Sequence, residues 1–273
     1  MMTALRSCSR RLRRLALPCL MLASLPVAAQ ARRPAAERTF WTGGSGGFTF
    51  AWTDRDLRAS VGTRRVWTAR TGPEKEARTM SGCTDYEVTV TLLSVVGSVA
   101  SYEETTSWYC TGAAHPSAYT TYRAVDASRP QAPAKLTDWF PEQEVRAALL
   151  ADPLVRKALT AARVRTPPAR LTALVQTLSE APSECEYAFS DDLLTRFAFH
   201  HLEGGKVAVR LGLSHGCEVM RGRLTQLGIL LPIPERLKAP LAQAAAGRQG
   251  FLADRGRTIA GDRTTELQLI SPK

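Results

Sequence analysis

Ser214 lies at the centre of a pattern that is typical of serine hydrolases. Residues 212–216, GLSHG, fit G-x-S-x-G, in which the serine attacks a carbonyl carbon from a sharp turn between a strand and a helix. That chemistry needs a histidine to take the serine's proton and a carboxylate to orient the histidine. The histidines of the chain are His115, His200, His201 and His215. Only His215 lies at or beyond the motif, and neighbouring side chains diverge, so the base is missing from its usual place.

The residues after the motif also disfavour the helix that such a turn requires. Residues 217–226, CEVMRGRLTQ, contain Gly222, two β-branched residues and Cys217, which we expect to form a disulfide. We therefore predict a loop that is pinned at Cys217. A serine hydrolase that uses Ser214 with a distant histidine is an alternative function, but the main expectation is that the protein is not an enzyme.

The histidines and acidic residues do not show the spacing of a metal site. His200 and His201 are adjacent on a predicted strand, where neighbouring side chains point to opposite faces, so we do not expect both in one site. Asp191 and Asp192 follow a serine and indicate a turn rather than a calcium loop. The chain has no C-x-x-C spacing for zinc, and GGSGG at residues 43–47 lacks the Lys-Ser/Thr of a phosphate loop. We expect no metal and no cofactor.

The first 31 residues have the composition of a secretory signal peptide. Five arginines and no acidic residue precede an apolar run from Leu15 to about Ala29, which ends in small residues. Cleavage is expected after Ala29 or Ala31, and the run is shorter than the roughly 20 residues of a membrane-spanning helix. We predict a periplasmic or secreted protein with no membrane span after cleavage, and a retained anchor is the alternative.

Removal of the signal peptide lowers the formal net charge from +11 to +6, because 31 basic residues then face 25 acidic ones. A mildly basic envelope protein is attracted to anionic wall or membrane surfaces. Its basic residues form scattered pairs such as Arg64 with Arg65, without the interleaved aromatic residues of a nucleic-acid site. We therefore do not expect nucleic acid as a partner.

Four cysteines remain after loss of the signal peptide, which indicates two disulfides in an exported chain. Sequence alone allows three pairings. A hairpin centred near residues 96 and 97 brings Cys83 opposite Cys110, since residues whose numbers sum to 193 then face each other. We therefore favour Cys83–Cys110, which leaves Cys185–Cys217.

The order of the expected elements predicts an α+β fold, with a mostly antiparallel sheet, a helical insertion between two strand groups and a C-terminal helix. Asp152 before Pro153 is a typical helix start inside the insertion. The expected strands are 47–59, 64–70, 86–96, 99–110, 118–126, 185–190, 195–202, 206–213 and 226–233, and the expected helices lie within 137–164, 168–180 and 234–245. We predict a flexible lead-in at 32–46, a single domain at 47–247, and a polar tail or edge strand at 248–273.

Residues 101–140 resemble a known family. TGAAHP at 111–116, the tyrosine-rich segment 119–126 and LTDWF at 136–140 resemble the extracytoplasmic domain that is shared by RsiV-like lysozyme-sensing anti-sigma factors and PdaC-like peptidoglycan deacetylases. Residues 197–213 and 227–241 resemble the later strands and the closing helix of that domain. Ala113 replaces a glycine of the family, and the segment after Leu211 differs from the family's loop, so contacts made there are not transferred.

The resemblance implies a binding or sensing module of the cell envelope whose ligand is a lysozyme-type muramidase or peptidoglycan. Deacetylase chemistry belongs to a separate domain in that family, so the resemblance gives no support to catalysis. A structural envelope protein is a further alternative. Binding residues are expected on loops that a rigid scaffold presents. The candidates are His115, Pro116, Tyr119, Ser214, His215, Arg221 and Arg223.

Overall fold

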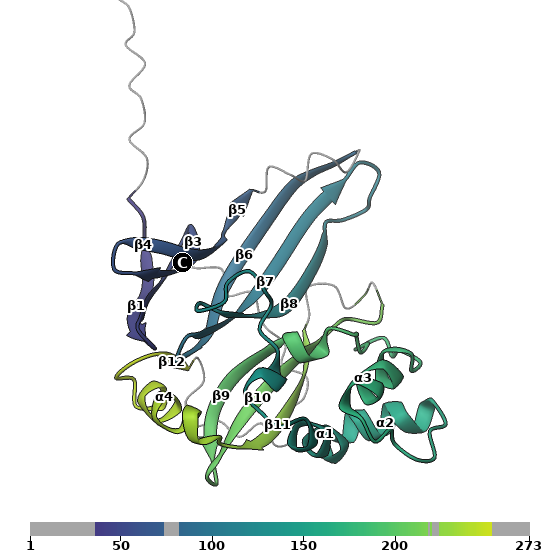
Figure 1. The fold of residues 1–273 in the computed structure, drawn as a ribbon. Helices are drawn as coiled ribbons and strands as arrows, with labels where there is room; N and C mark the ends of the chain where they lie inside the picture. The colour runs from purple at the N-terminus through teal and green to yellow at the C-terminus, as the bar shows by residue number, and fades with distance from the viewer. Residues whose placement is uncertain (1–35, 74–81, 218, 220–223, 253–273) are drawn as a thin grey trace, which may run out of the picture. The chain divides into compact units, whose positions relative to one another are not determined.

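The computed structural model describes residues 36–73, 82–217, 219 and 224–252. From Glu37 onward the described residues form one compact unit. The unit combines helices with antiparallel sheets (Figure 1), so the predicted α+β class is confirmed. None of the described helices is long and apolar enough to cross a membrane. The predicted signal peptide, Arg221, Arg223 and the tail after residue 252 lie outside the described residues.

The first sheet is an antiparallel meander of β1 (Thr39–Ser45), β2 (Phe48–Thr53), β3 (Asp56–Val61) and β4 (Arg64–Arg70). Residues 39–45 were expected in the flexible lead-in, and the structure corrects this boundary. The physical reason is the turn at Gly46 and Gly47, whose φ angles of 58° and 82° let β1 fold back onto β2. A stretch that suggests a linker by composition is therefore a hairpin turn.

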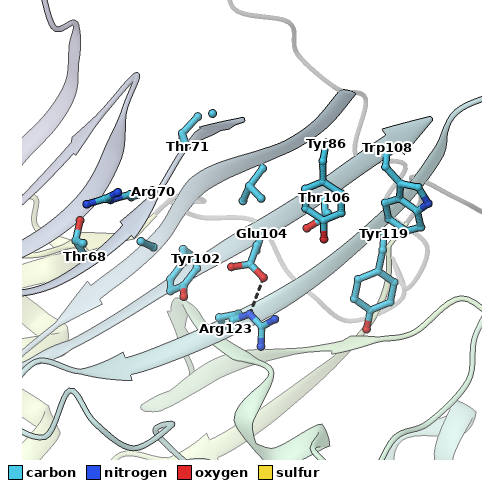
Figure 2. Close-up of a pocket in the computed structure, with 13 residues that line it drawn as sticks. Thr68, Arg70, Thr71, Tyr86, Tyr102, Glu104, Thr106, Trp108, Tyr119 and Arg123 are labelled. Carbon is cyan, nitrogen blue, oxygen red and sulfur yellow. Dashed lines mark hydrogen bonds and ion pairs between the residues drawn. The ribbon is translucent and has the colours of Figure 1, made fainter. Parts of the chain in front are cut away.

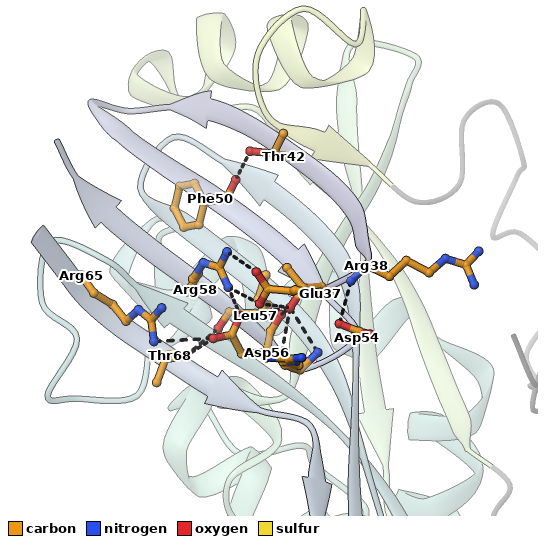
Figure 3. Close-up of polar contacts among 12 residues, drawn as sticks. Glu37, Arg38, Thr42, Phe50, Asp54, Asp56, Leu57, Arg58, Arg65 and Thr68 are labelled. Carbon is orange, nitrogen blue, oxygen red and sulfur yellow. Dashed lines mark hydrogen bonds and ion pairs between the residues drawn. The ribbon is translucent and has the colours of Figure 1, made fainter. Parts of the chain in front are cut away.

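An ion-pair network holds the start of β1 against β3 (Figure 3). Arg58 Nη1 lies 2.8 Å from Glu37 Oε1 and 2.7 Å from Asp56 Oδ1. The hydrogen bond from Arg58 holds the pKa of Glu37 below its usual value. Part of the basic charge of the first sheet is therefore neutralised within the sheet.

The second sheet has the order β12-β6-β7-β8, and β5 (Gly72–Pro73) also pairs with β6. Its strands are β6 (Cys83–Val96), β7 (Val99–Cys110), β8 (Ser117–Asp126) and the short β12 (Phe251–Leu252). Cys83 faces Cys110 and is bonded to it, as predicted. Two bulges on β6 shift the register, so that the residue numbers of facing pairs sum to 195 near the turn and to 193 at the cysteines.

The third sheet has the order β11-β10-β9, formed by β9 (Phe197–Glu203), β10 (Lys206–Leu213) and β11 (Thr225–Pro232). The helices are α1 (Glu142–Ala151), α2 (Pro153–Ala161), α3 (Leu171–Ser179) and α4 (Glu235–Ala245), with short 3-10 turns at Leu136–Asp138 and Leu193–Thr195. Asp152 caps α2 as predicted, because its Oδ1 accepts hydrogen bonds from the backbone N–H groups of Leu154 and Val155. The strand expected at 185–190 is absent. Only Ala188 pairs with Ser214 there, since the chain turns between Glu184 and Tyr187.

Two hydrophobic cores join these layers. The smaller core lies between the first and second sheets and includes the fully buried Phe50, Leu57 and Val95. The larger core lies between the helices and one face of the third sheet, and includes the buried Phe140, Leu149, Leu174, Phe199 and Leu241. The opposite face of the third sheet lies against the second sheet, as shown by the hydrogen bond of 2.7 Å from Tyr122 Oη to Gln226 Oε1.

Candidate functional site

The main candidate site is a groove on the second sheet, which we call the aromatic groove (Figure 2). It has a volume of about 890 Å³ and is open to solvent. Its floor consists of residues from β6, β7 and β8, and its wall is formed by the end of β4 and the residues that follow it. The lining residues are Thr68, Ala69, Arg70, Thr71, Gly72, Tyr86, Val88, Tyr102, Glu104, Thr106, Trp108, Tyr119 and Arg123.

The groove exists because the first sheet covers only part of the second. Every second residue of β7 points to the same face, so Tyr102, Glu104, Thr106 and Trp108 form one row. Tyr102 is buried in the smaller core, whereas the three residues that follow it in this row are half-buried. The register joins Thr106 to both Val88 and Tyr119, so the uncovered rows of the three strands form one surface.

Two aromatic rings lie against each other at one end of the floor, and we call this pair the platform. The rings of Tyr86 and Trp108 are stacked, with centroids 6.0 Å apart and an angle of 22° between their planes. The Cys83–Cys110 disulfide closes the same end of the hairpin. Asp85, beside Tyr86, has a φ of 55° within the bulge. The platform therefore lies at a hairpin end that a covalent bond closes.

Charged side chains lie farther along the floor. Glu104 and Arg123 form an ion pair with 2.8 Å between Glu104 Oε1 and Arg123 Nε, as Figure 2 shows. Arg70 stands on the wall and is exposed. The lining also contains the hydroxyl groups of Thr68, Thr71 and Thr106. The groove thus offers flat apolar rings, neutral hydroxyl groups and a guanidinium to one ligand.

Of the candidate residues, Tyr119 lines the aromatic groove and also connects it to the Ser214 loop. Tyr119 Oη lies 3.4 Å from Ser214 Oγ, and the Tyr119 ring lies 5.9 Å from the His215 ring. His115 and Pro116 are exposed on the loop between β7 and β8. Three predicted residues are therefore together at one edge of the groove, while Arg221 and Arg223 fall outside the described residues.

The surroundings of Ser214 are those of a structural hydroxyl. Ser214 Oγ accepts a hydrogen bond of 2.7 Å from Arg196 Nη1, and in the described part of the chain it bonds to no histidine. Arg196 is held in turn by Asp192, with 2.8 Å between Nε and Oδ1. A guanidinium cannot accept the serine's proton, so this geometry does not activate Ser214 as a nucleophile.

Close packing explains the two glycines of the GLSHG motif. A Cβ atom at Gly216 would lie 1.6 Å from the carbonyl oxygen of Glu184, and one at Gly212 would lie 3.2 Å from the ring of Tyr122. The Cys185–Cys217 disulfide follows the motif directly and was predicted correctly. The motif is therefore the sequence of a disulfide-pinned loop against which other parts of the chain pack.

A second polar cluster is buried between the second and third sheets, and we call it the polar interlayer. It contains Glu103, Tyr122, His200, His201, Arg210 and Gln226. The structure contradicts the expectation that the histidines point apart, since Nδ1 of His200 contacts Nδ1 of His201. A bulge in β9 shifts the register here, so that His201 pairs with Ala208 and Phe199 with Val209. The alternation of side chains is interrupted at His200, and both rings turn to one side.

Contacts connect these side chains in a row. Arg210 Nη2 contacts His200 Nε2, and this nitrogen is the acceptor because a guanidinium can only donate. Nδ1 of His200 contacts Nδ1 of His201, and Nε2 of His201 lies 3.2 Å from Glu203 Oε2. The two histidines therefore connect Arg210 to Glu203.

Glu103 adds a carboxyl group to the polar interlayer. Its burial raises its pKa to about 7, although a hydrogen bond from Thr105 and the positive charge of Arg210 oppose the shift. In the described part of the chain, no group of three or more His, Cys, Asp or Glu side chains is arranged to hold a metal ion.

Most of the groove residues were not candidates from the sequence. The available signal was the alternation of aromatic and polar residues along 102–108, which we interpreted only as a strand. The chain matches no family model, no curated protein and no solved structure.

Proposed function

We propose that this protein is an exported binding module of the cell envelope that holds a glycan chain in the aromatic groove. The observation that carries the proposal is the combination of the Tyr86–Trp108 platform with hydroxyl and charged groups in one open groove. A sugar ring has an apolar face of C–H groups and a rim of hydroxyl groups. Aromatic faces suit the first and polar side chains suit the second.

The envelope location is supported by the composition of residues 1–31 and by the two disulfides, Cys83–Cys110 and Cys185–Cys217. Such bonds persist in oxidising compartments outside the cytoplasm. Peptidoglycan is the glycan that the family resemblance implies. Its glycan strands are linear polymers, and a groove that is open to solvent can accept part of such a strand. The platform also favours binding, because an aromatic side chain loses little entropy when it contacts a ligand.

We propose binding without catalysis. The hydroxyl group of Ser214 receives a hydrogen bond from the guanidinium of Arg196, which cannot act as a base, and no described histidine hydrogen-bonds to this hydroxyl. A fluorophosphonate probe should therefore leave the protein unlabelled. Labelling that disappears in Ser214→Ala would instead favour the hydrolase.

The direct test is retention of the purified mature protein on isolated sacculi. We expect retention of the native protein and at least a tenfold loss of affinity for Trp108→Ala, since stacking on one aromatic ring contributes about 1–3 kcal/mol by analogy with other flat ligands. Tyr109→Ala is the matched control, because Tyr109 is exposed and adjacent but lies outside the groove lining.

Lysozyme on a solid support is the second arm of this experiment. Retention on lysozyme but not on sacculi would replace the glycan with a protein ligand. Retention on neither would refute the proposed function. Equal retention of Trp108→Ala and the native protein on sacculi would show that the binding surface lies elsewhere.

A further inference from the structure

We infer that the aromatic groove selects glycans that carry carboxylate groups, and that Arg123 is the residue that recognises the carboxylate. The inference rests on the proposed function, since it specifies the ligand of the same groove. The inference follows from how the charged groups of the lining are paired. The aromatic platform by itself does not indicate whether the glycan is acidic or neutral.

Among the described residues, the charge of the groove lining is positive and only partly compensated. These residues include two arginines and one carboxylate, which are Arg70, Arg123 and Glu104. Glu104 pairs with Arg123, whereas Arg70 forms no ion pair with the described residues. Since an anion gains attraction from an excess of positive charge and a neutral sugar does not, the groove favours an acidic ligand.

The pairing also orients Arg123 toward a ligand. Glu104 Oε1 accepts from Nε of Arg123, so this carboxylate is bound at one edge of the guanidinium. The two terminal amino groups, Nη1 and Nη2, form no hydrogen bond with the described residues, and 52% of the side chain is exposed. Two parallel N–H groups in one plane match the two oxygens of a carboxylate. Glu104 is thus a positioning residue that holds the guanidinium in place and leaves its other edge open.

The distance between charge and platform indicates an oligosaccharide rather than a single sugar. Arg123 and Tyr119 are four residues apart on β8, which corresponds to roughly 13 Å along the strand. Trp108 faces Ser117, two residues beyond Tyr119. A ligand that contacts both Arg123 and the platform therefore spans more than one ring. The carboxylate belongs to a different ring from the one that stacks on Trp108.

The test compares paired glycans that differ only in their carboxyl groups. One pair consists of peptide-free glycan strands with free lactyl carboxylates and the same strands after conversion to methyl amides. The other pair consists of a uronic acid oligosaccharide and its methyl ester. Affinities are measured by calorimetry for the full mature protein. We expect each acidic form to bind about ten to a hundred times more tightly than its neutral partner, as for one charge-assisted bidentate contact. If only one pair shows this difference, that pair identifies the source of the carboxylate.

Variants separate this inference from the proposed function. Arg123→Gln should bind acidic and neutral forms equally while still binding both. Arg123→Lys should recover only part of the preference, because it keeps the charge but loses the planar pair of donors. Arg64→Gln, an exposed arginine of β4 outside the groove lining, should keep the full preference. Trp108→Ala should weaken both forms alike.

Equal affinity of the native protein for the acidic and neutral forms would overturn the inference and leave the proposed function standing. The same holds if Arg123→Gln retains the native preference. Failure of the native protein to bind any glycan would refute the proposed function, and the inference with it. Circular dichroism and thermal unfolding of each variant exclude misfolding as the cause of lost binding.

Discussion

Replacing Glu103 with glutamine should remove a loss of stability that the native protein undergoes as the pH rises. Glu103 is 9% exposed, and burial raises the pKa of its carboxyl group from 4.5 to about 7. Between these two values the folded protein holds a proton at Glu103 that the unfolded chain does not. Stability from this group is therefore fully present below about pH 4.5 and is lost as the pH rises through 7.

The size of the effect follows from the shift of the pKa. A shift of about 2.5 units corresponds to roughly 3 kcal/mol, since each unit is worth about 1.36 kcal/mol. Above pH 7 the native protein holds a buried carboxylate whose cost is only partly offset by the charge of Arg210. Glutamine has the same shape but no charge. We therefore expect Glu103→Gln to match the native protein near pH 5 and to exceed its stability by up to about 3 kcal/mol near pH 8.

Urea unfolding at pH 5, 6, 7 and 8 measures this difference directly. Glu87→Gln is the control, because Glu87 is an exposed residue of the neighbouring strand β6 and this variant retains Glu103. It should show the same dependence on pH as the native protein. The reasoning is refuted if Glu103→Gln and the native protein lose stability in parallel between pH 5 and 8, since Glu103 would then be ionised in both states.

Three other predictions concern stability and use the midpoint of thermal or urea unfolding. Gly216→Ala should destabilise the protein by about 2–3 kcal/mol, because the added Cβ overpacks against the backbone of Glu184. Gly212→Ala should destabilise it less, because the nearest contact of its Cβ is the ring of Tyr122. Equal effects of the two variants would contradict the packing explanation of the motif. Loss of the Cys185–Cys217 bond, which spans 32 residues, should cost about 3 kcal/mol, and a reductant should have no further effect at this loop in the double serine variant. Asp152→Ala should cost about 1 kcal/mol as a lost helix cap, whereas Asp152→Asn should be nearly neutral, and an equal loss in both would indicate a different role for Asp152.

The disulfide between Cys83 and Cys110 was predicted from the hairpin even though the register near the turn was not. The turn lies at residues 97 and 98, between the two expected strands, but the numbers of the facing residues beside it sum to 195 rather than 193. Two bulges on β6 each insert one residue, and together they restore the predicted pairing at the cysteines. Bulges arise from local backbone conformations such as that of Asp85, which alternation of residue types does not reveal. The hairpin does bring the two cysteines together as predicted, but the pairing also depends on two bulges that were not predicted.

The same kind of irregularity explains the wrong prediction for the histidine pair. An ideal strand separates neighbouring side chains, and His200 and His201 were assigned to opposite faces on that basis. The bulge in β9 removes the alternation at this single point and turns both rings into the polar interlayer. Two partners hold the rings in position. Arg210 on the neighbouring strand β10 contacts His200, and Glu203, two residues after His201, contacts His201. Such partners become visible only when the register of the third sheet is known.

The aromatic groove was not predicted because its parts are far apart in the sequence and are ordinary within each strand. Along β7, the even-numbered residues from Tyr102 to Trp108 face the groove, while Ser101 and Glu103 face the polar interlayer. Both faces of β7 therefore carry polar residues, and both are partly covered by other parts of the protein. A sequence pattern with one apolar and one exposed face identifies neither the aromatic groove nor the polar interlayer. The first sheet determines which residues become a groove, because it buries Tyr102 and stops before Glu104. The end of the first sheet therefore determines which part of β7 is uncovered. Under the proposed function, the residues that bind are those that the first sheet leaves uncovered.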